Sequence, residues 1–314
     1  MRICSFLPSA TEILYSLGLG ESVVGVTHEC DFPPEIMIKS QVVKSSFDLR
    51  SLSSSEIDTL VSESSKAGKS TYIVELDALR EARPDLIVTQ DLCEVCAVSG
   101  DETIDAIKAL DHTPEVVSLY PKSLEGILDT IIVLGEATGT QRRAREVTEA
   151  LRGRIEAVRS ALAGERDRPR VFPMEWLEPP YVGGHWVPEM IEIAGGDCGL
   201  GEAGEPSRRV SWEEIEGFAP QMIIVMACGF DVERTIDEID AVTSNPSWRS
   251  TPASRKGHVY ITDANSYFSR PGPRIVEALE ILARILHPEV CDYPIPVDSV
   301  INLRNYLYFQ NSLG

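Results

Sequence analysis

The sequence of 314 residues lacks any apolar run long enough to cross a bilayer, since no stretch approaches 18 apolar residues. Basic residues are also scarce. Lys and Arg total 29 against 49 Asp and Glu, which gives a formal net charge of -20 at pH 7. A negative field of this size repels nucleic acid and anionic membrane surfaces. We therefore expect neither nucleic acid binding nor membrane insertion.

Common catalytic signatures are missing as well. The sequence has no Gly-x-Ser-x-Gly nucleophile elbow, no phosphate-binding loop ending in Lys-Ser or Lys-Thr, and no His-Glu-x-x-His. Gly18-Leu-Gly20 is too short for a dinucleotide-binding fingerprint. The carboxylates are spread along helical segments, as is typical of solvated faces. These absences predict that the protein is not an enzyme.

The cysteines also lack a pattern, because seven are scattered along the chain and an odd number does not suit a disulfide framework. The N-terminus leads directly into a predicted strand at residues 2–7, with no basic segment, apolar segment and cleavage site in front. We expect a reducing compartment and a cytoplasmic location. A processed mature form would instead be periplasmic or extracellular.

Apolar strands alternate with helical segments along most of the chain, which is typical of parallel sheets. Ser9 and Glu12 match a capping box at the start of the first helix. The other expected helices cover residues 54–64, 75–82, 101–110, 187–194, 212–218, 232–242 and 273–286. The expected strands cover residues 2–7, 23–27, 85–89, 115–119, 170–173, 222–227 and 258–262.

Residues 123–163 keep a helical pattern far longer than an average helix, and Gly139 is expected to split it. The second part is polar over more than half its circumference, as in a helix that bridges two bodies. We therefore expect an α/β fold in which two Rossmann-like lobes with parallel sheets are bridged by a long interlobe helix. The lobes are residues 1–122 and 169–287, the helical segment is 123–168, and the tail 288–314 has no assignment.

Ligands of such sheets bind beyond the carboxyl ends of the strands. Aromatic and small residues gather there, which favours a large flat ligand in a cleft between the lobes. Each aromatic residue could instead cap the core of its lobe, His185 could cap a helix, and Arg270 could brace its own loop. The candidate ligand-binding residues are Pro8, Ser9, His28, Glu29, Tyr72, Gln90, Asp91, Trp176, His185, Trp186, Phe230, Tyr267, Phe268 and Arg270.

Several motifs together suggest a family. The segments 6–12 (Phe-Leu-Pro-Ser-Ala-Thr-Glu), 24–28 (Val-Gly-Val-Thr-His), 84–88 (Pro-Asp-Leu-Ile-Val) and 255–260 (Arg-Lys-Gly-His-Val-Tyr) resemble those of the cobalamin-type substrate-binding proteins of ABC importers. The resemblance covers about residues 2–287. It implies the helical-backbone periplasmic-binding-protein fold with little hinge closure, and cobalamin or a related corrinoid as ligand. Relatives bind ferric siderophores, haem or metal ions, so the fold does not fix the ligand.

The resemblance also implies a partner, since an exported protein of this type would serve an ABC transporter. The segments Thr27–Cys30 and Gln90–Cys96 depart from the importer proteins and are similar to those of cobalamin-binding proteins without a signal peptide. For such a protein we expect the role of a corrinoid carrier or store.

Those two segments supply a group of metal-ligating residues. Their expected strand-end positions would bring together His28, Cys30, Cys93 and Cys96, a set that suits Zn²⁺ or another thiophilic metal. The two later cysteines could equally be a redox dithiol or small buried residues, and His28 or a cysteine could coordinate cobalt. The alternative functions are therefore a metalloprotein or metallochaperone, or a thiol-dependent enzyme that acts on a corrinoid, such as a decyanase or reductase.

Overall fold

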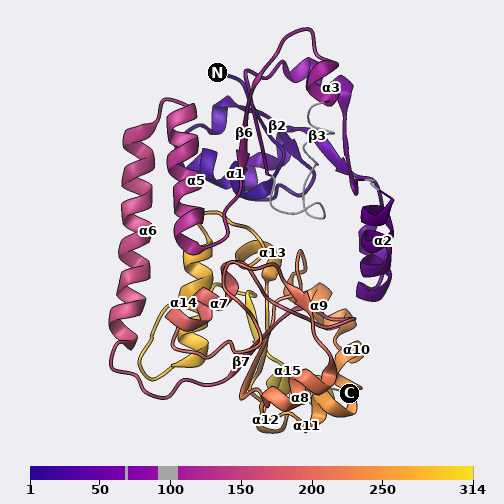
Figure 1. The fold of residues 1–314 in the computed structure, drawn as a ribbon, viewed down its shortest axis with the longest axis vertical. Helices are drawn as coiled ribbons and strands as arrows, with labels where there is room; N and C mark the ends of the chain where they lie inside the picture. Colours follow the sequence, from indigo (N-terminus) through magenta and orange to yellow (C-terminus); the bar gives the residue numbers. More distant parts are fainter. Residues whose placement is uncertain (68–69, 91–104, 314) are drawn as a thin grey trace.

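The computed structural model describes residues 1–67, 70–90 and 105–313. They form two α/β lobes, one above the other in Figure 1, with the helices α5 (Leu124–Ala137) and α6 (Gln141–Leu162) along one side. The split between these two helices was expected, and it occurs at Gly139, which has a φ of +72°. No described helix is both long and apolar enough to span a membrane.

The first lobe contains a sheet with the strand order β4-β3-β2-β1-β5-β6. The central strands are fully buried apolar runs, as parallel strands covered on both faces must be. The parallel strands are β1 (Ile3–Ser5), β2 (Val23–Thr27), β3 (Ser40–Ser45), β5 (Leu86–Gln90) and β6 (Glu115–Leu119), and β4 (Tyr72–Val74) is antiparallel to β3. The helices are α1 (Pro8–Ser16), α2 (Ser54–Lys66) and α3 (Leu76–Ala82), with 3-10 turns at Gly20–Ser22, Pro34–Ile38 and Leu49–Ser51.

The second lobe contains a sheet with the order β12-β11-β10-β7-β8-β9. Its parallel centre is β7 (Val171–Trp176), β10 (Met222–Val225) and β11 (Val259–Thr262), and its antiparallel edges are β8 (Tyr181–Val182), β9 (Arg208–Arg209) and β12 (Val300–Asn302). The helices are α7 (Val187–Ile193), α8 (Trp212–Phe218), α9 (Val232–Glu238), α10 (Asp240–Thr243), α11 (Pro246–Ser250), α12 (Pro252–Lys256), α13 (Ala264–Tyr267), α14 (Ile275–Leu286) and α15 (Leu303–Leu313).

The sheets differ from the expected parallel ones at their edges, where both are mixed. The antiparallel strands are two or three residues long, which is too short to show a periodic pattern. The tail without an assigned structure supplies one of them, because β12 pairs with β11 before α15 ends the chain.

The expected capping box at the first helix is wrong. Helix α1 begins at Pro8, and its N-cap residue, Leu7, makes no side-chain cap. Ser9 is buried, and the Glu12 carboxylate is bound by arginines of the second lobe instead. The Glu12 carboxylate therefore pairs with arginines distant in the sequence, and not with a backbone N–H of its own helix as the capping box would require.

One hydrophobic core runs through both lobes. It contains Ile13 of α1, Ile131 of α5, Ile155 of α6 and Leu279 of α14, so the helices along the side are part of it. Helix α6 contributes a single stripe with helical spacing, made of Ala144, Thr148, Leu151, Ile155, Val158 and Leu162. The far faces of the two sheets have separate cores.

Candidate functional site

The carboxyl ends of the first lobe's strands are joined to the second lobe by a group of charges, of which Glu12 and Arg270 are buried. Arg270, which precedes α14, lies 2.8 Å from Asp31 through Nη2 and 3.4 Å from Glu12 through Nη1. Arg274 binds both oxygens of the Glu12 carboxylate, at 2.9 and 2.6 Å. Asn265 adds a hydrogen bond of 3.1 Å to Asp31. We call these five residues the interlobe charge cluster.

The cluster is charged at neutral pH. Burial by itself would raise the pKa of Asp31, but hydrogen bonds and charge from Arg270 outweigh it and lower that pKa. The pKa of Arg270 is raised in turn, because its bonds and charge interactions with Asp31 and Glu12 exceed the opposing effect of burial. Arg270 also donates to the Glu29 carbonyl at 3.0 Å and to Asn265 at 3.1 Å. Arg270 therefore ties its own loop to the first lobe, a role across the lobes that the sequence analysis did not predict.

A polar and aromatic group from the first lobe adjoins the cluster. The Tyr72 hydroxyl donates to Glu29 at 3.0 Å, and the ring of His28 lies 6.1 Å from that of Tyr72 at an angle of 51°. His28 Nδ1 is 3.2 Å from the hydroxyl of Thr27. All three predicted side chains are partly exposed, so they are open to a ligand. They lie together because only β3 separates β2 from the edge strand β4 in the sheet.

The second lobe contributes Trp176, at the end of β7. Its ring lies 5.1 Å from that of Phe230, centre to centre, at an angle of 59°, and its Nε1 donates to the Ser54 carbonyl of α2 at 3.1 Å. The backbone carbonyl of Phe230 accepts from the N–H of Asn265 at 3.0 Å, which connects this pair to the interlobe charge cluster. Trp176 stays half-buried, whereas Phe230 belongs to the core of the lobe.

Other predicted site residues are in the core. Trp186 is 5% exposed, and its Nε1 donates to the carbonyl of Phe268, which is itself buried. Ser9 and Gln90 are buried, Pro8 is partly buried, and Tyr267 lies beneath the guanidinium of Arg274. The alternative given for each aromatic residue is that it caps the core of its lobe. The burial of Trp186 and Phe268 agrees with that alternative. Asp91, Cys93 and Cys96 lie outside the described residues.

His185 differs from its neighbour Trp186. Its φ is +52°, its ring stacks on Trp186 at 5.6 Å, and its buried Nδ1 has no hydrogen-bond partner within the described ranges. Burial lowers the pKa of His185, and the charge of Lys122 lowers it further. The ring is therefore neutral and keeps an unpaired nitrogen, which costs free energy unless a ligand pairs with it.

Cys30 faces the core of the first lobe rather than the cleft. Its thiol lies 3.1 Å from the Thr11 hydroxyl, and burial raises its pKa to about 12. A neutral thiol is a poor metal ligand. No third ligand joins His28 and Cys30 within the part of the chain that the structure describes. The burial of Cys30 in the core matches core packing, and the predicted site with Cys93 and Cys96 stays a prediction, because these two residues lie outside the described part of the chain.

A groove of about 810 Å³ lies between the lobes on the side of α6. Leu151 and Arg154 of α6, Phe32 of the first lobe and Pro273 of the second form part of its wall. The guanidinium of Arg274 lies 4.2 Å from the centre of the Phe32 ring. The groove therefore adjoins the interlobe charge cluster, because Glu12 and Arg274 belong to both.

Sequence reasoning missed most of the interlobe contacts. Glu12, Asp31, Asn265 and Arg274 were not predicted, although Asp31 follows a strand end and Asn265 lies in a predicted strand-end loop. Helix α2 was missed as an interlobe element, and Asp58 on it accepts from the Tyr181 hydroxyl and from Arg209 of the second lobe. Nothing in a helix pattern shows which distant element covers it.

A model of the family described as periplasmic binding protein matches residues 3–266. The chain belongs to this family of periplasmic binding proteins. Curated relatives of this periplasmic binding protein include the vitamin B12-binding protein of Vibrio cholerae, 23% identical over 93% of this chain and 88% of the relative. Another is an uncharacterized ABC transporter substrate-binding lipoprotein of Bacillus subtilis, YvrC, 23% identical over 92% of this chain and 80% of the relative.

Solved structures share the two-lobed fold. The periplasmic vitamin B12 binding protein BtuF of Vibrio cholerae superposes with a TM-score of 0.65 at 22% identity, covering 91% of this chain and 96% of that one. The periplasmic heme-binding protein RhuT of Roseiflexus sp. RS-1 gives 0.69 at 20% identity, covering 92% and 98%. The family and the two-lobed α/β fold expected from the sequence are confirmed. The different ligands named for these proteins leave the ligand of this periplasmic binding protein open.

Proposed function

We propose that this periplasmic binding protein binds a corrinoid between its two lobes and acts as a carrier, store or transport-associated binding protein. The observation that carries the proposal is the placement of partly exposed His28, Tyr72 and Trp176, from both lobes, around the interlobe charge cluster. Rings of this kind bind the faces of large flat ligands, and the imidazole can bind a metal at their centre. A curated relative and a solved structure, both from Vibrio cholerae, are named for vitamin B12.

The first test mixes purified, reduced protein with hydroxocobalamin, separates it by gel filtration and records the visible spectrum of the protein peak. A coeluting corrinoid with a shifted spectrum is expected. Haemin is run in parallel, because RhuT is named as heme-binding. A colourless cobalamin sample beside a coloured haemin sample would assign the cleft to haem and reject the corrinoid.

Single substitutions can show which of two histidines is a ligand of the cobalt. His28 is partly exposed beside Tyr72, and His185 has a buried, unpaired Nδ1. If His28 coordinates cobalt, His28→Ala removes the spectral shift, and His185→Ala leaves it. An unchanged spectrum and affinity in His28→Ala would reject coordination by that residue.

The transport role has its own test. The Bacillus subtilis relative is named as an ABC transporter substrate-binding lipoprotein, and an ABC importer is the partner that an exported form of this chain would need. Fractionation of cells that express the natural gene would distinguish the two roles. Recovery with the membrane or the exterior supports transport, and recovery in the cytoplasm supports a carrier or store.

A further inference from the structure

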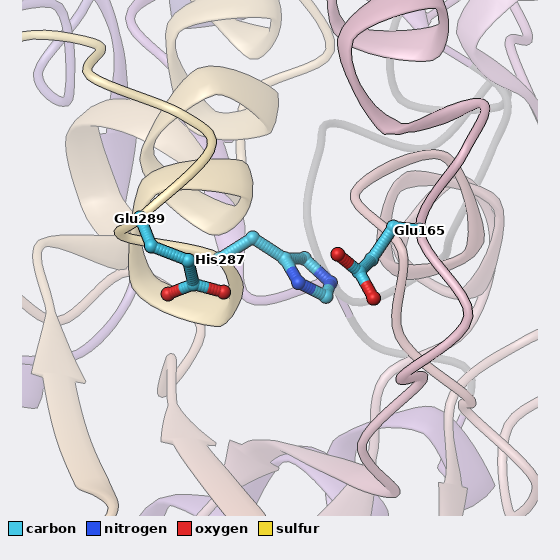
Figure 2. A group of neighbouring side chains, drawn as sticks. All are labelled: Glu165, His287 and Glu289. Carbon is cyan, nitrogen blue, oxygen red and sulfur yellow. The ribbon is translucent and has the colours of Figure 1, made fainter.

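A second group of polar side chains lies where α6 passes into the second lobe. Glu165 is in the linker after α6, and His287 and Glu289 follow α14. One ligand atom of each side chain lies within 4.8 Å of those of the other two. Figure 2 shows the two carboxylates on either side of the imidazole ring. The three residues therefore surround one small volume at the junction of two helices.

His287 is held as a metal-binding histidine commonly is. It is 3% exposed, and its Nε2 lies 3.2 Å from the carbonyl oxygen of Gly195. The carbonyl can only accept, so Nε2–H donates, and Nδ1 is the ring nitrogen left for a ligand. A backbone carbonyl on one ring nitrogen fixes the tautomer and orients the other nitrogen toward a metal.

In the Glu165 carboxylate, one oxygen accepts hydrogen bonds from the linker and the other does not. Its Oε1 accepts from the backbone N–H groups of Asp167 and Arg166, each at 2.8 Å. These hydrogen bonds hold Oε1 and fix the orientation of the carboxylate. Its Oε2 takes no part in them and is available to a cation.

The neighbouring arginines do not neutralise this group. Arg168 donates to the backbone carbonyls of Glu192 and Gly196, and Arg284 pairs with Asp292 at 2.8 Å. In the described part of the chain, neither Glu165 nor Glu289 forms an ion pair with Lys or Arg. Two carboxylates thus face one imidazole without a positive partner, which is the charge pattern of a cation site.

We propose that Glu165, His287 and Glu289 bind one divalent first-row transition metal ion. Imidazole and carboxylate ligands suit Mn²⁺, Fe²⁺, Co²⁺ or Zn²⁺. Glu289 is exposed, so water can complete the coordination. Because Glu165 follows α6 and the other two follow α14, the ion would fasten the linker of the interlobe helix to the second lobe. This site is separate from the one predicted at His28 and the cysteines.

The test uses the full chain stripped of metal with EDTA and titrated with Mn²⁺, with free Mn²⁺ measured by electron paramagnetic resonance. Thiols are poor ligands for Mn²⁺, so the cysteines do not compete. We expect one site per chain, at least about tenfold weaker binding in Glu165→Gln and His287→Gln, and no change in Glu149→Gln, an exposed carboxylate on α6. Mn²⁺ should also raise the unfolding temperature of the unchanged protein and not that of Glu165→Gln.

Equal affinity in the unchanged protein, Glu165→Gln and Glu149→Gln would overturn the proposal, because it would show general attraction by a chain of net charge -20. Failure of the unchanged protein to bind Mn²⁺ would overturn it as well. If His287→Gln does not fold, Glu165→Gln still decides the question, since Glu165 is in a partly exposed linker.

Discussion

Two helices join the lobes on opposite sides of Figure 1, and they do so by different interactions. On one side, α6 contributes its apolar stripe to the core that both lobes share, and Arg154 pairs with Glu280 of α14 at 2.7 Å. On the other side, α2 is carried by the first lobe and contacts the second mainly through polar groups. Its N-terminal Ser54 N–H donates to Glu238 at 2.6 Å.

The α2 contacts are concentrated on a few atoms. Asp58 accepts from Tyr181 at 3.0 Å and from Arg209 at 2.6 Å, and Trp176 donates to the Ser54 carbonyl. The apolar contact on this side is made by Ile57, which is buried in the second lobe's core, and by the partly buried Val61, Leu49 and Leu52, which pack against that core. Core burial is lost only when the protein unfolds, whereas exposed polar contacts are weak and screened by salt. We therefore expect the contacts of α2 with the second lobe to contribute less to stability than the packing on the α6 side.

The largest effect is expected on the α6 side. Ile131→Ala removes a fully buried side chain of α5 and leaves a cavity in the shared core, so the free energy of unfolding should fall by about 2–5 kcal/mol. Urea unfolding followed by circular dichroism measures this change. Val133→Ala is the matched control on the same helix, because Val133 is 42% exposed, and it should change stability by less than about 0.5 kcal/mol. Equal losses would show that α5 is not packed into the core in this way.

A smaller, local effect is expected on the α2 side. Asp58→Asn weakens the bonds from Tyr181 and Arg209, and because Arg209 is half exposed we expect only about 1 kcal/mol. Amide hydrogen exchange should become faster in α2 and stay unchanged in α5 and α6. Glu63→Gln, on an exposed position of α2, is the control. Faster exchange throughout the protein would contradict the idea of a separate α2 contact.

The smallest effect is expected in the pH dependence of stability. The pKa of Asp31 is lowered in the folded protein, so its contribution to stability is present above the unfolded pKa of about 3.9 and is lost as the pH falls through the folded value. Nearly half of the Asp31 side chain is exposed, which weakens the pairing with Arg270. The unfolding temperature of Asp31→Asn should therefore lie below that of the unchanged protein at pH 7, and the gap should close at acid pH. A gap that stayed constant down to pH 3 would exclude Asp31 as its source.

Local patterns predicted many of the elements, although β3 and the short helices α11 and α12 were missed. The helical segment 123–163 does split at Gly139, and the strands at 23–27 and 115–119 have the expected bounds. These elements are long or strongly apolar, so their periodicity alone decides their conformation. The edge strands β8 and β9 were missed because two residues carry no periodicity.

The site was predicted less completely, since strand ends can be located from a sequence but contacts between them cannot. Trp176 ends β7 and Trp186 follows the next strand, β8, yet one contacts α2 and the other fills the core. Arg270 and Asp31 are 239 positions apart, and no pattern within either segment indicates their pairing. Burial periodicity shows which face of an element is covered and not which element covers it.

The tail of the chain protects the second sheet from association with other molecules. Without β12, the main-chain donors and acceptors of β11 that now pair with Val300, Ile301 and Asn302 would be open. An open strand edge is a template for pairing with another chain. Removal of the last 15 residues would thus replace the three-residue edge strand β12 by the unpaired edge of the longer strand β11, and we expect aggregation at high concentration as the result.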